Sequence, residues 1–195
     1  MSQCLFQKEF DFGIFQTFDS KPEFECFRVH QVHGVDFNHE NEDKKADGIY
    51  GKQTKAWAII TADCLPVVIH GKNGNVFFHA GWRGLADKIY LEPQVKAIEP
   101  IYAFIGPHIC ADKFEVQKDF YQHFPNSSSF LQHLDGKITF DLLKELTSGL
   151  QSAYTGIQID DAKLCTYKND QFHSFRLDKT SKRNWNVFTS KTINI

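Results

Sequence analysis

The sequence predicts a mixed α/β fold in a single domain, residues 1–195, with mixed sheets flanked by helices. A length of 195 residues and an apolar share of 42% suffice for one substantial core. Short apolar segments typical of strands alternate with segments of helical periodicity. The net charge of −2 gives no electrostatic footprint for nucleic acid or an anionic membrane, so we expect neither as a partner. No apolar stretch approaches the roughly 20 residues of a membrane helix.

Apolar runs predict the strands. The pair Asn73-Gly74 predicts a hairpin between two of them, and Gly106-Pro107 predicts the end of another. The charged stretch 38–45 predicts a loop. The predicted strands cover residues 56–61, 65–70, 75–79 and 101–105.

Three segments have the pattern of helices. The clearest is 141–154, where leucines form one stripe and Asp141 stands near the positive N-terminal end. Residues 85–98 are interrupted by Pro93, which predicts two short helices. Aromatic and apolar residues on one face of 114–124 predict a further helix.

The cysteines predict reduced thiols. Their number is odd, they are scattered, and no C-x-x-C pair occurs. The N-terminal stretch carries acidic residues and lacks an apolar export signal, so we expect a cytoplasmic protein without a disulfide framework. The five positions are Cys4, Cys26, Cys64, Cys110 and Cys165.

Three short motifs carry residues suited to metal binding. They are residues 29–34 (VHQVHG), 61–66 (TADCLP) and 79–84 (HAGWRG). Each places His33, Cys64 or His79 beside a small residue or at the end of a predicted strand, where site residues gather. Imidazole and thiolate are ligands that zinc prefers, and three ligands leave a position open for catalysis. Their spacing matches no local zinc signature, so a core cysteine with locally hydrogen-bonded histidines remains the alternative.

Together with further motifs, these segments resemble the laccase-domain family, also called the polyphenol-oxidase-like or purine nucleoside phosphorylase family. The motifs follow the family's order over about residues 28–190, whereas residues 1–27 are divergent and lack its Arg-x-Gly-Gly loop. The resemblance implies a mixed α/β domain with His33, Cys64 and His79 as zinc ligands. The matching segments are 31–34 (QVHG), 46–48 (ADG), 61–66, 79–84, 105–109 (IGPHI), 114–116 (FEV), 165–166 (CT) and 172–176 (FHSFR).

Other residues are candidates for the chemistry beside Cys64 and His79. Asp63 is a candidate to orient a ligand or to act as a base, with a turn acid as the alternative. Arg83, in a glycine turn, is a candidate phosphate contact, and so is Arg176 in a basic stretch; a surface role is the alternative for both. For His108 with its neighbour Cys110 we expect local packing instead of a second metal.

The resemblance favours a zinc-dependent purine nucleoside enzyme that cleaves adenosine, inosine or methylthioadenosine with phosphate and deaminates adenosine. Its partners would be a nucleoside and phosphate, and a monomer or weak dimer fits equally. The alternative is a hydrolase that edits peptidoglycan precursors with Cys64 as nucleophile and His79 as base. Copper can replace zinc in vitro, but laccase-like phenol oxidation needs several coppers and more ligands than these. A non-catalytic binding module is the last alternative, and the physiological substrate stays open.

Overall fold

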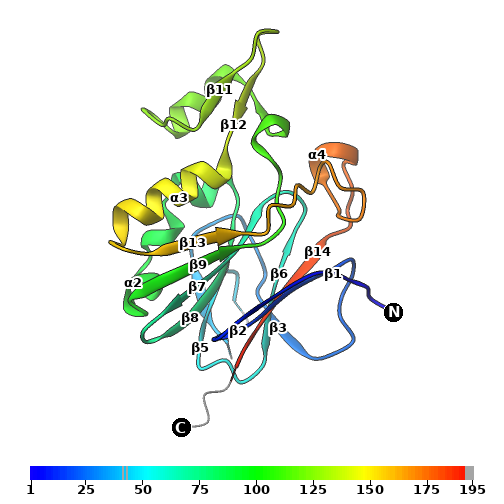
Figure 1. Cartoon of the computed structure of the whole chain (residues 1–195), viewed down its shortest axis with the longest axis vertical. Helices are drawn as coiled ribbons and strands as arrows, with labels where there is room; N and C mark the ends of the chain where they lie inside the picture. The colour runs from blue at the N-terminus through cyan, green and yellow to red at the C-terminus, as the bar shows by residue number, and fades with distance from the viewer. Residues whose placement is uncertain (41, 43, 192–195) are drawn as a thin grey trace.

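The fold combines two large sheets, one small sheet and few helices. The computed structural model describes residues 1–40, 42 and 44–191. One large sheet has five strands in the order β1-β2-β14-β6-β3. This architecture confirms the predicted mixed α/β class (Figure 1). The bounds of these strands are β1 Cys4–Phe10, β2 Gly13–Phe18, β14 Asn184–Ser190, β6 Ala56–Thr61 and β3 Cys26–Arg28.

The second large sheet has six strands in the order β13-β9-β7-β8-β5-β4. Its centre is the predicted hairpin, in which β7 and β8 pair antiparallel from Leu65↔Ala80 to Gly71↔Gly74. The predicted loop 38–45 begins as strand β4, and positions 41 and 43 lie outside the described residues. The bounds are β13 Gln158–Asp161, β9 Pro100–Ile105, β7 Leu65–Gly71, β8 Gly74–Ala80, β5 Gly48–Gly51 and β4 Phe37–His39.

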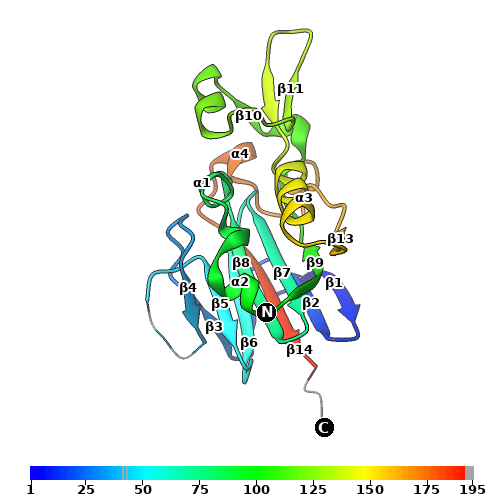
Figure 2. The ribbon, with the colours of Figure 1, turned by 90° about the vertical axis from the view of Figure 1, so that its left-hand side faces the viewer.

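The small sheet, in the order β10-β12-β11, stands beyond one end of the two large sheets (Figure 2). Its strands are β10 Glu115–Val116, β12 Ile138–Phe140 and β11 Phe130–Gln132. Here the prediction of a helix over 114–124 is wrong. The backbone of Phe114 and β10 pairs with β12, and only Lys118–His123 forms a helix, of the 3-10 type. Tertiary pairing therefore overrides the local pattern.

The helices agree in part with the segments that the sequence predicts. Helix α3 (Leu142–Ala153) confirms the clearest prediction, and its N-cap Asp141 accepts a hydrogen bond from the Lys144 N–H at 2.9 Å. Two short helices form near the predicted segment 85–98, but with other bounds: α1 (Trp82–Ala86) begins before the segment, and α2 (Pro93–Ala97) begins at Pro93 itself. A 3-10 turn at Ile89–Leu91 separates them. The remaining described α-helix, α4 (Phe175–Asp178), is also short. No described helix has both the length and the apolar character needed to cross a membrane.

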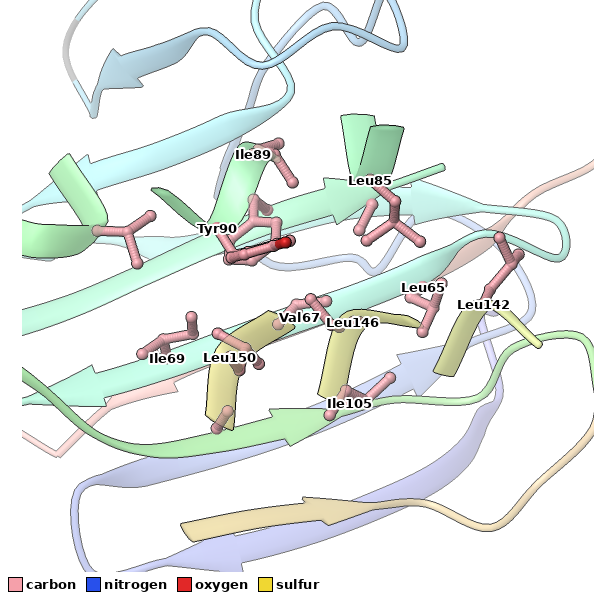
Figure 3. Close-up of a cluster of buried hydrophobic side chains, with 14 of the residues drawn as sticks. Leu65, Val67, Ile69, Leu85, Ile89, Tyr90, Ile105, Leu142, Leu146 and Leu150 are labelled. Atoms are coloured by element: carbon pink, nitrogen blue, oxygen red, sulfur yellow. The ribbon is translucent and has the colours of Figure 1, made fainter. Parts of the chain in front are cut away.

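The six-stranded sheet is buried on both faces. On one face, Val67 and Ile69 of β7 pack with Leu146 and Leu150 of α3 (Figure 3). On the other face, Val68 packs in a cluster with residues of the five-stranded sheet. Each fully buried aliphatic side chain contributes about 1.5–3 kcal/mol. The result is a rigid layer whose strand ends hold the candidate site. The second cluster includes Phe15, Trp57, Ile59, Phe77, Phe104 and Phe188.

Candidate metal centre

The three predicted ligands meet at one end of the β7–β8 hairpin. Cys64 immediately precedes β7 and His79 lies near the end of β8, so antiparallel pairing brings them together. His33 joins them from the loop between β3 and β4. The candidate ligand atoms of the three residues all lie within 4.8 Å of one another. His33 is exposed and His79 is buried, so the group opens to solvent on the His33 side.

The backbone around the ligands is specialised for this convergence. His33 adopts a φ of 62° and Asp63 a φ of 95°, values in the left-handed region that non-glycine residues rarely adopt. Such conformations cluster at functional sites, where surrounding bonds hold them. Gly81 keeps the centre open, because a Cβ there would lie 3.2 Å from the Cys64 Sγ and 3.3 Å from the His33 ring.

Asp47 organises two of the three ligands. Its buried carboxylate accepts hydrogen bonds from the Nδ1 of His79 at 2.7 Å and from the His33 N–H at 3.0 Å. It also accepts from the N–H groups of Val32 and Gly34 at 3.1 and 2.7 Å. The bond to His79 fixes the proton on Nδ1 and leaves Nε2 for a metal.

The sequence patterns do not single out Asp47 as a site residue, although it lies within the ADG segment. Its backbone carbonyl also accepts from the His79 N–H at 2.7 Å, so Asp47 bonds to His79 through both backbone and side chain. Burial raises the pKa of its carboxyl group, but the hydrogen bonds from His79 and the backbone outweigh burial and lower it. Asp47 is therefore ionised, as a partner of a metal-ligating histidine should be.

Cys64 and His79 form a charged pair in the metal-free protein. Burial opposes ionisation of the thiol, but the charge of His79 and hydrogen bonds from His33 and His79 lower the pKa of Cys64 to about 6. For His79, burial is outweighed by the Cys64 thiolate and by Asp47, which raise its pKa to about 9. A thiolate is the form of cysteine that binds a metal or acts as a nucleophile. The donor set of two imidazoles and one thiolate fits a borderline metal ion.

Asp63 lies directly before Cys64, and both oxygens of its carboxylate accept hydrogen bonds from distant segments of the chain. Oδ1 accepts from the hydroxyls of Thr166 and Ser174 at 2.8 and 2.6 Å, and Oδ2 accepts from the Arg176 N–H at 2.6 Å. The Asp63 carbonyl accepts from the Ile109 N–H at 2.9 Å. Asp63 therefore connects the Cys64 loop to segments that lie far along the chain.

The two predicted arginines lie outside the ligand group. Arg83 is exposed, with its guanidinium carbon 4.7 Å from the centre of the Trp82 ring. Arg176 donates from Nη1 to the carbonyl of Glu115 at 2.5 Å and lies over Phe114. Arg176 also lines a polar pocket of about 640 Å³, whose lining does not include His33, Cys64 or His79.

His108 forms a hydrogen bond to a nearby backbone group, and Cys110, two residues further along the chain, is part of a disulfide. The Nδ1 of His108 donates to the carbonyl of Gly106 at 2.8 Å. Cys110 forms a disulfide with Cys165, so the prediction that all five cysteines are reduced thiols is wrong at these two. The sequence offers no signal for this pairing, because the partners are 55 residues apart and meet only through the parallel strands β9 and β13.

The chain is thus a mixed α/β protein with a candidate His-Cys-His metal centre at its strand ends. A family model described as multi-copper polyphenol oxidoreductase laccase matches residues 14–190. The chain belongs to this family, as its sequence motifs predict.

Named relatives and solved structures agree with this assignment. The purine nucleoside phosphorylase YfiH of Escherichia coli (strain K12) is 35% identical over 173 residues, which cover 80% of this chain and 70% of the relative. The purine nucleoside phosphorylase Cj1217c of Campylobacter jejuni is 24% identical over 203 residues, which cover 92% and 87%. The crystal structure of Neisseria meningitidis NMB0706, of the family DUF152, has a TM-score of 0.75 and 27% identity. That likeness covers 85% of this chain and 75% of that one.

Proposed function

We propose that this protein is a zinc-dependent purine nucleoside enzyme, which cleaves adenosine, inosine or methylthioadenosine with phosphate and deaminates adenosine. The observation that carries the proposal is the convergence of His33, Cys64 and His79 within 4.8 Å around the space left by Gly81. Relatives with the name purine nucleoside phosphorylase support the substrate class.

In this proposal the ligands are the thiolate of Cys64, the Nε2 of His79 and a ring nitrogen of His33. Zinc supplies Lewis acidity and a nucleophile at neutral pH when it is bound. Asp47 holds the His79 ring in its ligand tautomer and fixes the His33 loop. The exposed position of His33 gives a substrate access to the centre.

We assign Asp63 the orienting role, because the scaffold bonds of its carboxylate hold the backbone that presents Cys64. Arg83 is the proposed phosphate contact, since its side chain is exposed and a guanidinium binds phosphate through two N–H donors. Arg176 is a second proposed anion contact at the wall of its polar pocket.

Copper-dependent phenol oxidation fits the site less well, despite the family's description. In the described part of the chain, His33, Cys64 and His79 form the one group of three or more potential ligands. Multi-copper oxidation needs several coppers and therefore further ligand groups. Copper bound at this centre would be a substitute for zinc.

A second candidate is a metal-free hydrolase, for which peptidoglycan precursors are the proposed substrates. Its support is the thiolate–imidazolium pair, with the pKa of Cys64 lowered to about 6 and that of His79 raised to about 9. In this candidate Cys64 is the nucleophile and His79 exchanges protons with the leaving group. Cys64 cannot serve as zinc ligand and free nucleophile in the same state.

Metal content and nucleoside turnover, measured on the same preparations, test these candidates. We expect one zinc per chain in the native protein, with loss of zinc and purine release in Cys64→Ala. The matched control is Cys26→Ala, which changes a free cysteine of β3 and should keep both. A chelator should abolish turnover and added zinc should restore it. Nucleoside turnover that persists in metal-free protein would overturn the zinc proposal. A native protein that holds no zinc and turns over no nucleoside would favour the hydrolase.

A further inference from the structure

The Cys110–Cys165 disulfide lies where the small sheet joins the six-stranded sheet. Cys110 follows β9 and Cys165 follows β13, and these two strands are parallel neighbours. The chain between the cysteines forms the small sheet, which stands beyond one end of the large sheets (Figure 2), and then α3 and β13. The disulfide therefore joins the segment that follows β9 to the segment that follows β13, across a sequence separation of 55 residues.

Both segments that the disulfide joins also bind Asp63. The segments bond to each other through His108, whose N–H donates to Leu164 and whose carbonyl accepts from Thr166 at 2.9 Å. From the Cys110 side, the Ile109 N–H donates to the Asp63 carbonyl; from the Cys165 side, the Thr166 hydroxyl donates to its carboxylate at 2.8 Å. A change at the disulfide therefore reaches Asp63 from two sides, one residue from the ligand Cys64.

The disulfide is accessible to a small reductant. Both cysteines are half-buried, unlike the fully buried Thr166 beside them. They line a pocket of about 250 Å³, which has room for a low-molecular-weight thiol. The other lining residues are His108, Ala111, Asp141, Leu143, Asp161, Lys163 and Leu164.

We propose that Cys110 and Cys165 form a reversible dithiol–disulfide site that controls the His33–Cys64–His79 centre through Asp63. This inference rests on the metal site of the proposed function. The co-reactant is a dithiol: one of its thiolates attacks a cysteine sulfur, forms a mixed disulfide and releases the other cysteine, which takes a proton. The second thiol of the reductant then displaces the first cysteine. Two electrons and two protons pass to the protein, and the reductant leaves as a disulfide.

The oxidised form holds Ile109 and Thr166 in the register that binds Asp63 on both sides. In the reduced form the hydrogen bonds alone maintain this register, so the Asp63–Cys64 loop opens more often. A loosened support around a metal ligand weakens metal binding, by 10–100-fold where such a group is removed outright. We expect reduction to act at the lower end of this range, raising the zinc dissociation constant roughly tenfold.

The test uses the full chain with Cys4→Ser and Cys26→Ser, which leaves Cys64 and the pair. Thiol alkylation with mass spectrometry should find Cys64 alone free after oxidation, and all three cysteines free after treatment with a dithiol. Two readouts follow once the reductant is removed: hydrogen exchange of residues 61–66, and zinc affinity against a competing chelator. The further change Cys165→Ser should match the reduced form in both readouts and should not respond to the reductant.

Three results would overturn the inference: three free thiols after oxidation, unchanged hydrogen exchange over residues 61–66, or a zinc affinity that reduction leaves unaltered. The exchange readout requires neither zinc nor substrate, so it tests the link to Asp63 by itself. Redox-dependent zinc binding without nucleoside turnover would support the inference while contradicting the proposed nucleoside chemistry. Turnover with redox-independent zinc binding would contradict the inference alone.

Discussion

Two buried aspartates support the candidate centre in different ways. Asp47 accepts hydrogen bonds from a ligand side chain and from the loop of a second ligand, all from residues 13 to 32 positions away. Asp63 touches no ligand side chain through its carboxylate bonds, which come from residues 103 to 113 positions away. Asp47 thus orients the candidate ligands themselves, whereas Asp63 anchors the backbone that carries one of them.

The largest effect is expected for Asp47→Ala. It leaves the buried His79 ring and three N–H groups without their acceptor, so zinc affinity should fall 10–100-fold. The free energy of unfolding should fall by about 3–5 kcal/mol, as when one partner of a buried pair is removed. Chelator competition and urea unfolding measure the two quantities. Asp135→Ala, at an exposed acid of the β11–β12 hairpin, is the control and should change neither. An unchanged zinc affinity in Asp47→Ala would refute the role of Asp47.

Asp63→Asn tests whether Asp63 mainly stabilises the backbone around Cys64 and has a smaller effect on zinc binding than Asp47 has. The amide can still accept on one side, but its NH₂ group opposes the donors that now meet a carboxylate. We expect a loss of about 1.5–3 kcal/mol in the free energy of unfolding, typical of a hydrogen bond to a charged group. Zinc affinity should fall less than in Asp47→Ala. If zinc affinity falls further than in Asp47→Ala, the assignment of ligand orientation to Asp47 and backbone anchoring to Asp63 is wrong.

A smaller effect is expected for Ser174→Ala. The Ser174 hydroxyl donates to Asp63 and also caps α4 by accepting from the Leu177 N–H at 3.3 Å. Loss of a helix cap costs about 1 kcal/mol, and Asp63 keeps its other donors. Thermal unfolding should show the loss, while zinc affinity should fall less than in Asp63→Asn. A large fall in zinc affinity would mean that the remaining donors, Thr166 and Arg176, are not enough to hold Asp63 in place.

The smallest expected effect is a pH dependence of the free energy of unfolding that arises from His108, next to the Asp63 partner Ile109. Burial lowers the pKa of His108 below its usual value of 6.5, so the folded protein resists a proton that the unfolded chain accepts. This contribution to stability is therefore fully present above pH 6.5 and is lost as the pH falls below it. Urea unfolding at several pH values should show a shallower acid loss in His108→Gln. An identical pH profile would show that His108 does not titrate in this range.

Local chemistry in the sequence is enough to predict several elements of the fold. Strand β6, the β7–β8 hairpin and α3 follow from apolar periodicity, an Asn-Gly pair and an N-cap aspartate. Ligand chemistry and motif order also single out His33, Cys64 and His79, and the structure brings these three residues together. Their role as metal ligands stays a prediction.

The residues that support this trio emerge from long-range contacts in the folded chain. Asp47 is one acid among many until β5 pairs with β8 and places it against His79. Cys110 and Cys165 meet because β9 and β13 lie parallel after a long excursion, and residues 114–116 extend because β12 offers backbone partners. These contacts join residues far apart along the chain, and a local pattern carries no information about such distances because they arise only when the sheets assemble.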